Sequence, residues 1–407
     1  MAQLNTQLET VYIYDAVRTP RGKAREDGAL HDLTPYDLMS TLYSALEQRT
    51  ELSPEKIEDV ILGCATQSGE QAANIAKTST LYHGWPTSIP GITVNRYCSS
   101  GIDAINFAAM KVMTGMNQMV VAGGVEMMSR VAMLSDKPAP FMDYKLAGKL
   151  GMFMMGSGAD LVATLTESDR EAVDEVALNS QKRAAHANEN GYFSSIIPVY
   201  NPSKDMTLER EEIVRPSTDK DSLAKMPPSF ADLGAKGVDA ALLAGFPEHN
   251  SINHVHTAAN SPAMADGAAA LLIGSEAAGK DLKVKPRARI RAMVNINDDT
   301  RTVIAGCVAA TKALMQQENL TADDVDLFEI HEAFAATMIH CKSELGIDDD
   351  KLNVNGGCIA LGHPLGATGA IMTGTLLDEL ERRNLKTGIV AASGAAGAGT
   401  ALMIERV

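Results

Sequence analysis

One order of elements occurs twice in this chain, and that repeat restricts the fold more than any other feature. The first copy opens with a β-rich run at 11–14, continues with a helical pattern at 38–46 and then has a second β-rich run at 57–63. The succession returns late, with a helix-like stretch at 302–315 and an acidic start to a strand-like run at 322–330. Such an internal duplication predicts two similar halves.

The repeat continues through two glycine-rich turns. The first copy comprises a strand-like run at 92–101, a helical run at 102–112 and a strand at 119–122 that ends in Gly123-Gly124. The second comprises a run at 352–355, a helical run at 371–380 and a strand at 389–392 that ends in Ser393-Gly394. Alternating strands and helices pack as layers, so the expected class is α/β. Cys98 and His363 stand at equivalent turns before the helix.

The segment 129–260 lacks this rhythm and is interpreted as an insertion carried by the first half. A loop of that length without structure is implausible in a compact fold, so we expect helices within it. Residues 171–188 form one helix candidate, and Ser168 has capping-box spacing ahead of Glu171. The predicted domains are an N-terminal half at 1–128, an inserted domain at 129–260 and a C-terminal half at 261–407.

The size and net charge of the chain restrict its domain count and the kinds of partner that it can bind. A chain of 407 residues with 45% apolar and 21% charged residues suits two or three packed globular units. The net charge of −15 argues against nucleic acid as a partner, because phosphate binding needs concentrated Lys and Arg. An anionic ligand held by a local basic patch or by helix N-termini stays possible.

Cysteine usage and the first residues indicate the compartment. The five cysteines are odd in number and form no C-x-x-C pair, which predicts reduced thiols and no zinc site. The first ten residues show no basic-then-apolar signal, and no apolar run has membrane-spanning length. We expect a cytoplasmic protein without a transmembrane segment.

Cys98 is the first candidate for chemistry. It stands between a strand-like run and a helix start, where the positive end of the helix dipole is expected to lower the thiol pKa. The alternative is a buried structural cysteine. His363 is the second candidate, because Gly362 and Pro364 place its imidazole at a tight turn before a helix. Two equivalent helix starts meeting near a pseudo-dyad would pair base with nucleophile.

Other histidines have alternative interpretations. His331 ends a strand, where it suits an oxyanion-hole donor, and Ala335 breaks the H-E-x-x-H pattern of a zinc enzyme. His254 and His256 have metal-ligand spacing, but no third ligand lies near, so loop packing or ligand contact is favoured. No metal site is predicted.

Three long motifs now carry a resemblance. V-N-R-Y-C-S-S-G at 94–101, H-E-A-F-A-A at 331–336 and V-N-G-G-C-I-A-L-G-H-P-L-G-A-T-G-A at 354–370 resemble the signatures of the thiolase family. The match extends from R-T-P-R-G at 18–22 through A-G-G-V-E at 122–126 and Asn260-Ser261, so it covers nearly the whole chain. Within the family, N-H-V-H-T at 253–257 resembles bacterial 3-ketoacyl-CoA thiolases, the acetyl-CoA C-acyltransferase (β) subunits of trifunctional fatty-acid oxidation complexes.

The resemblance implies a fold and roles. The fold would be two α/β halves in α-β-α-β-α layers with an inserted loop domain that cradles CoA. Cys98 would accept the acyl group and His363 would take its proton, while His331 and His363 would bind the thioester oxygen. The backbone N–H groups of Cys98 and Ala395 would form a second oxyanion hole. Ser261 would lie near pantetheine and Phe334 would line its tunnel.

The implied reaction is cleavage of 3-ketoacyl-CoA by CoA into acyl-CoA and acetyl-CoA, in fatty-acid β-oxidation. CoA is then a substrate, and no cofactor is implied. Thiolases are dimers or tetramers, so a homodimer or a dimer of dimers is expected, with a hydratase/dehydrogenase α-subunit as a possible partner.

The sequence departs from the family at Ser393, where a second reactive cysteine is usual. A serine hydroxyl is a far weaker acid than a thiol of pKa ~8.5 and shuttles a proton poorly. Three explanations stay open: a deliberate change that traps substrate, reduced natural activity, or related chemistry without that thiol. Cys358 is interpreted as a small buried residue rather than a substitute.

Two other functions therefore remain alternatives. Cys98, His331 and His363 supply the residue types of a ketoacyl-synthase-like condensing enzyme, which uses decarboxylation in place of proton removal. A non-catalytic CoA-binding scaffold subunit is the second. We also hypothesise that the Met-rich stretch 142–155 receives an acyl chain or an α-subunit, with ordinary packing as the alternative.

Overall fold

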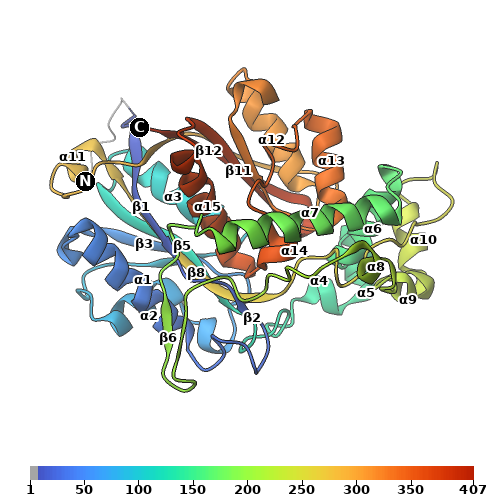
Figure 1. Ribbon diagram of the computed structural model, residues 1–407, viewed down its shortest axis with the longest axis horizontal. Coiled ribbons are helices and arrows are strands. Elements are labelled where there is room, and N and C mark those ends of the chain that lie inside the picture. Colours follow the sequence, from blue (N-terminus) through green and yellow to red (C-terminus); the bar gives the residue numbers. More distant parts are fainter. Residues whose placement is uncertain (1–7) are drawn as a thin grey trace.

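A computed structural model describes residues 8–407 and shows a ten-stranded sheet built from two unequal parts (Figure 1). The first part has the order β4 (Ile92–Val94), β3 (Asp59–Gly63), β5 (Met119–Met127), β8 (Ala265–Ser275) and β1 (Val11–Arg18), with β2 (Gly22–Lys23) beside β8. The second has the order β9 (Ala288–Asn297), β12 (Ala398–Arg406), β11 (Thr387–Ser393) and β10 (Leu327–Ile330). The parts join where β1 pairs with β9.

Strand directions repeat in the two parts, which confirms the duplication. β1, β8 and β5 are successively antiparallel, and β5, β3 and β4 are parallel. In the second part β9, β12 and β11 are successively antiparallel, and β11 and β10 are parallel. A parallel bridge between Phe328 and Leu352 takes the place of the fifth strand.

The strand pairing moves one predicted domain boundary. β8 falls in the predicted C-terminal half at 261–407, but it pairs with β1 and β5 of the first part. The chain therefore returns from the insertion to complete the first part of the sheet before it begins the second. The halves meet after Ser275 rather than at residue 261.

Helices cover both faces of each part and confirm the predicted layers. α1 (Pro35–Thr50) and α2 (Ile75–His83) pack on one outer face, and α12 (Gly306–Gln317) and α13 (Ala335–Leu345) on the other. Between the two parts lie α3 (Ser100–Met113) and α15 (Thr368–Arg382), inside an apolar cluster that includes Ile105, Leu271, Leu377 and Leu402. This is the order helix, sheet, helix, sheet, helix.

Short elements connect these layers. They are η1 (Pro54–Lys56), η2 (Gly69–Gln71), α11 (Glu276–Gly279), η4 (Ala322–Asp324), α14 (Cys358–Leu361), η5 (Leu365–Ala367) and η6 (Ala395–Gly397). The predicted helix at 302–315 begins only at Gly306, and the strand predicted to end before Gly123-Gly124 continues to Met127.

Two glycines let α3 and α15 meet at their N-termini. A Cβ atom on Gly101 would lie 2.6 Å from the backbone N of Ala370. A Cβ atom on Gly369 would lie 2.5 Å from Cγ1 of Ile102. Any larger residue would push the helices apart, so these glycines bring the turns before the two helices together.

The insertion lies between β5 and β8, and most of its helices gather at one end of the molecule, on the right in Figure 1. Its elements are α4 (Ala139–Met142), α5 (Tyr144–Leu150), α6 (Met155–Leu165), α7 (Arg170–Glu189), β6 (Val199–Asn201), β7 (Met206–Leu208), α8 (Lys220–Ala224), α9 (Ala231–Leu233), η3 (Gly234–Val238) and α10 (Asp239–Leu243). The helix predicted at 171–188 is confirmed as α7. Its cap is Asp169, whose carboxylate accepts from the Ala172 N–H, so the prediction of Ser168 was wrong.

No helix within residues 8–407 is both long and apolar enough to cross a membrane. Residues 1–7, on which the absence of a leader signal was partly judged, lie outside the described residues.

Candidate active site

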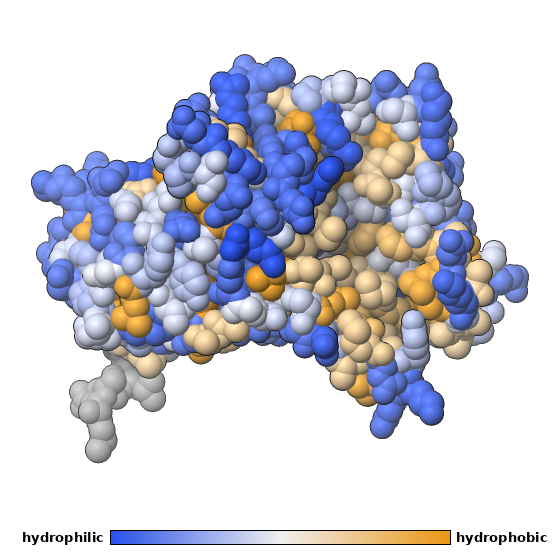
Figure 2. Space-filling view, turned by 90° about the horizontal axis from the view of Figure 1, so that it is seen from below, coloured by the Kyte–Doolittle hydropathy of each residue, from blue (hydrophilic) through white to orange (hydrophobic). Residues whose placement is uncertain are grey.

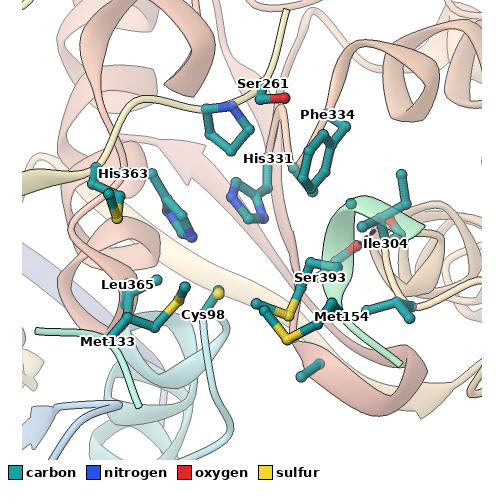
Figure 3. A pocket seen from close by; sticks show the side chains of 18 of the residues that line it. Cys98, Met133, Met154, Ser261, Ile304, His331, Phe334, His363, Leu365 and Ser393 are labelled. Atoms are coloured by element: carbon teal, nitrogen blue, oxygen red, sulfur yellow. Dashed lines mark hydrogen bonds between the residues drawn. The ribbon is translucent and has the colours of Figure 1, made fainter. Parts of the chain in front are cut away.

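A cavity of about 320 Å³ opens where the insertion meets the N-termini of α3 and α15 (Figure 3). All the site residues predicted from the sequence line this one cavity: Cys98, Ser261, His331, Phe334, His363, Ser393 and Ala395. They come from both halves and from the end of the insertion. The fold therefore gathers residues that are far apart in the sequence.

Cys98 lies two residues before α3, in a turn held by its neighbours. Tyr97 has a φ of 53°, and the Arg96 N–H donates to the Ser100 hydroxyl at 2.8 Å. The Ser99 hydroxyl donates to the backbone oxygen of Ala392 in β11 at 2.9 Å. The turn is thus fixed to the strand that ends in Ser393.

The predicted lowering of the Cys98 pKa was wrong. Burial, followed by the nearby Glu126 carboxylate, raises the pKa of Cys98 to about 12. Desolvation disfavours the thiolate more strongly than the helix N-terminus favours it. The thiol consequently needs a base before it can act as a nucleophile.

His363 can supply that base. It follows α14 and Gly362, which has a φ of 102°, rather than a strand as predicted. Its Nδ1 lies 2.7 Å from the Thr368 hydroxyl oxygen, which leaves Nε2 for the cavity. Burial, with His331 and Arg21, lowers the pKa of His363 well below its usual value, so the ring is neutral at pH 7.

His331 directly follows β10, as predicted, and stands beside His363. The ring centroids are 4.3 Å apart, and Figure 3 shows both imidazoles facing the space that holds the Cys98 thiol. Burial lowers the pKa of His331 to about 4. Neither ring nitrogen has a hydrogen-bond partner within residues 8–407. A buried unpaired imidazole is costly, and it is available to a ligand oxygen.

Ser393 is the last residue of β11, and its hydroxyl is already engaged. It donates to the backbone oxygen of Ile304 at 2.6 Å and accepts from the Cys307 N–H at 2.9 Å. The residue is 3% exposed. Ser393 lines the cavity, as a reacting group would. Its hydroxyl nevertheless makes two hydrogen bonds to the backbone, as a structural residue does.

Glu126 and Thr368 support the site but were given no role by sequence reasoning. The buried Glu126 carboxylate accepts the Ala65 N–H at 2.8 Å and the Gly366 N–H at 2.9 Å. It thereby ties the loop after His363 to the first half. The A-G-G-V-E motif contained this residue, and its signal was a carboxylate inside an otherwise apolar strand.

Two groups of residues remain as candidates for metal binding. One group is held by an aspartate, and the other includes the two histidines of the cavity. Nδ1 of His254 and Nδ1 of His256 each lie 2.8 Å from an oxygen of Asp160, which agrees with the packing interpretation. Ligand atoms of His331, Cys358 and His363 lie within 4.8 Å of one another. Cys358 is buried, and burial raises its pKa.

A layered duplicated fold that brings one thiol and two neutral imidazoles into an apolar cavity is the arrangement of a cysteine-dependent acyltransferase. Residues 11–245 match the thiolase N-terminal domain and residues 284–406 match the thiolase C-terminal domain. The chain belongs to the thiolase family.

Similar proteins are found along almost the whole chain. A 3-ketoacyl-CoA thiolase of Cronobacter sakazakii is 37% identical over 409 residues, covering 98% of this chain and 100% of that protein. The Bacillus anthracis acetyl-CoA acetyltransferase structure has a TM-score of 0.85 at 32% identity and covers 99% of this chain and 100% of that one. The structure of human mitochondrial 3-ketoacyl-CoA thiolase in complex with CoA has a TM-score of 0.85 at 32% identity. The match covers 98% of this chain and 99% of that one.

Proposed function

We propose that the protein is a 3-ketoacyl-CoA thiolase that cleaves 3-ketoacyl-CoA with CoA through an acyl-Cys98 intermediate. The observation that carries the proposal is the shared cavity of Cys98 and the neutral His363. His363 takes the thiol proton, and the thiolate attacks the 3-keto carbon. The bond between C2 and C3 then breaks, and the departing acetyl-CoA enolate takes up a proton. Attack by CoA on the acyl-Cys98 thioester releases acyl-CoA.

Two sets of donors serve the oxygens that become negative. The backbone N–H groups of Cys98 and Ala395 donate no hydrogen bond to another residue within 8–407, and both residues line the cavity. They serve the oxygen of the tetrahedral adduct on Cys98. His331, with its free ring nitrogens, and His363 serve the thioester oxygen of the enolate.

The insertion provides a path for CoA. Beside Ala259 lies a polar pocket whose lining includes Arg215, Ser217 and Thr218. Ser261 follows Ala259 by two residues in the chain, and it lines the cavity together with Phe334. We place the phosphates of CoA by Arg215 and the pantetheine along Ser261 and Phe334.

Ser393 limits the step of the thiolase cycle in which CoA is activated. It therefore favours one alternative function, that of a condensing enzyme. Without an acidic thiol, activation of CoA depends on the imidazoles alone. The trio of Cys98, His331 and His363 in one cavity is also the set that a decarboxylating condensing enzyme requires. Malonyl-CoA with acetyl-CoA separates these functions, because release of carbon dioxide without cleavage of 3-ketoacyl-CoA favours the condensing enzyme.

We also propose the setting of the enzyme: fatty-acid β-oxidation in the cytoplasm, as a homodimer that a hydratase/dehydrogenase α-subunit joins. Strand β4 forms an edge of the sheet near Cys98, and Phe107 and Met110 of the adjacent α3 are exposed. An open edge with apolar neighbours suits pairing with a second copy. All five thiols are unpaired, which suits a reducing compartment.

The proposal is tested by incubation with acetyl-CoA and mass spectrometry of the Cys98 peptide. We expect an acetyl adduct on Cys98, and none in Cys98→Ala or His363→Ala. The Cys341→Ala variant, which loses a buried thiol outside the cavity, is the matched control and should keep the adduct. CoA binding without an adduct on Cys98 would instead support the scaffold function.

A further inference from the structure

The two imidazoles of the cavity lie close to a second cysteine, which has no role in the proposed acyl transfer. One ligand atom from each of His331, Cys358 and His363 lies within 4.8 Å of the others. All three side chains are buried. Nitrogen and sulfur are the ligand atoms that Zn²⁺ prefers, with bonds of about 2.0–2.3 Å in tetrahedral geometry. Small side-chain movements would therefore bring all three atoms onto one ion.

Cys98 can supply a fourth ligand. Its thiol faces the same space as both imidazoles (Figure 3). The residue is only partly buried, so an ion that enters the cavity can reach it. With Cys98 the set consists of two cysteines and two histidines, a combination that is common in structural zinc sites. A cation deprotonates the thiols that coordinate it, and two thiolates balance the charge of Zn²⁺.

The hydrogen bonds of the two imidazoles leave suitable ring nitrogens free. Nδ1 of His363 lies 2.7 Å from the Thr368 hydroxyl oxygen, so Nε2 is the atom available to a cation. Histidines that bind a metal usually have such a partner on the other ring nitrogen. Neither ring nitrogen of His331 has a hydrogen-bond partner within residues 8–407, although the residue is 2% exposed. A cation would provide this buried ring with the partner that it lacks.

Glu332 and Ser180 hold the backbone on both sides of Cys358. The Gly357 N–H donates to the Ser180 hydroxyl at 3.0 Å. The Ile359 N–H donates to the Glu332 carboxylate at 3.0 Å, and the Ser180 hydroxyl donates to the same carboxylate oxygen at 2.8 Å. Because Glu332 directly follows one of the two histidines, these bonds fix a sulfur ligand relative to a nitrogen ligand. Such outer contacts orient the ligands of a metal site.

The lining of the catalytic cavity favours a soft cation over a hard one. None of its described lining residues carries a carboxylate. Figure 2 shows a hollowed, largely apolar area on the side of the molecule that carries the insertion. Mg²⁺ and Ca²⁺ require oxygen ligands, whereas thiolate and imidazole together suit Zn²⁺.

We propose that Cys98, His331, Cys358 and His363 form an inhibitory Zn²⁺ site. The ion binds the sulfur of the nucleophile and Nε2 of the base at once, so neither group can begin acyl transfer. Sequence spacing did not point to this set, because its members come from separate segments of the chain. Zinc binding goes beyond the proposed thiolase function and does not depend on it, whereas inhibition of acyl transfer does.

Zinc affinity is measured on the reduced full-length chain by competition with a chromophoric chelator. We expect a single Zn²⁺ per chain. Cys358→Ala should weaken the affinity by at least about tenfold, since loss of even an outer contact of a metal site costs about 10- to 100-fold. Cys341→Ala, which removes a buried thiol outside the cluster, is the matched control and should bind as the parent does. Equal affinities in the parent and in Cys358→Ala would overturn the site.

Co²⁺ gives a second measurement that reports the ligands directly. The parent loaded with Co²⁺ should show the charge-transfer absorption of thiolate bound to cobalt, and Cys358→Ala should show less of it. Thermal unfolding of both variants without metal checks that they are folded. A cobalt complex without thiolate absorption would also overturn the site.

The inhibitory effect is measured on Cys98 itself. Zn²⁺ should protect Cys98 from iodoacetamide and prevent its acetylation by acetyl-CoA, and a chelator should reverse both effects. At the same Zn²⁺ concentration Cys358→Ala should be less inhibited, with each variant compared with its own rate without zinc. Zinc binding that leaves Cys98 fully reactive would overturn the inhibitory role. If Cys98 takes no acetyl group even without zinc, the thiolase function fails, while protection from iodoacetamide would still support the metal site.

Discussion

The imidazoles of His331 and His363 lie with ring centroids 4.3 Å apart and ring planes inclined by 40°, although they come from separate segments of the C-terminal half. Both rings are buried, and in both the pKa is lowered by that burial. Two protonated imidazoles at this separation would repel each other, so the pair is stable as neutral rings. The neutral form is the one that can accept the Cys98 proton.

The thiol of Cys98 should be reactive only at high pH in the enzyme without substrate. Because the pKa is raised to about 12, the thiolate fraction and the rate of alkylation by iodoacetamide should rise about tenfold per pH unit from pH 7 to 9. Alkylation is followed by mass spectrometry of the Cys98 peptide. A plateau near pH 8 would contradict the raised pKa.

Ser393→Cys should restore a proton shuttle. General acid–base groups contribute about 10²- to 10⁴-fold, and we expect a gain of that order in thiolysis of acetoacetyl-CoA with little change in acylation of Cys98. Ser393→Ala is the comparison. It removes the bonds to Ile304 and Cys307 and should lower the free energy of unfolding by about 1–3 kcal/mol. No gain in Ser393→Cys would mean that the thiol is not the missing group.

Thr368→Val should misplace the base without touching substrate. The hydroxyl holds Nδ1 of His363 at 2.7 Å, and small displacements of catalytic groups cost up to about 10²-fold in rate. We expect kcat for Cys98 acylation to fall while KM changes little, with recovery in Thr368→Ser. A fall in stability with normal kcat would show a purely structural role.

Glu329→Gln should stabilise the protein at alkaline pH. Burial raises the pKa of Glu329 to about 8, so the folded state retains a proton that the unfolded chain loses near pH 4.5. The folded state binds more protons, and stability therefore falls as pH rises from about 4.5 to 8. Thermal unfolding should give a higher Tm for Glu329→Gln at pH 8 and an unchanged Tm at pH 4. The exposed Glu344→Gln is the control and should show no such difference.

Sequence patterns were sufficient to predict the two turns that carry Cys98 and His363, because turns of this kind depend on neighbouring residues. Glycines and a proline around His363, and the succession of strand, turn and helix around Cys98, predicted two equivalent turns, and the structure places both in one cavity. The pKa of Cys98 was predicted in the wrong direction, because it depends on burial by distant segments and on Glu126. No local rule reports that burial.

Dependence on distant segments also explains the wrong domain boundary at β8, and folded geometry explains the wrong cap of α7. β8 looks like the start of the second half, and only its pairing with β5 assigns it to the first. Asp169 caps α7 although Ser168 has the better sequence spacing, because the carboxylate next to the helix reaches the Ala172 N–H. Thr368 supports His363 through a bond that closes only when the turn is folded.

The position of β8 also affects how the chain folds during synthesis. β5 and β8 are hydrogen-bonded neighbours, and the whole insertion is the connection between them. Until residue 275 has left the ribosome, β1 and β5 each lack the strand that separates them, and a nascent chain that stops earlier exposes two unpaired edges. Since loop-closure entropy grows only slowly with length, this connection can lengthen or shorten at modest cost while the reacting groups stay in place.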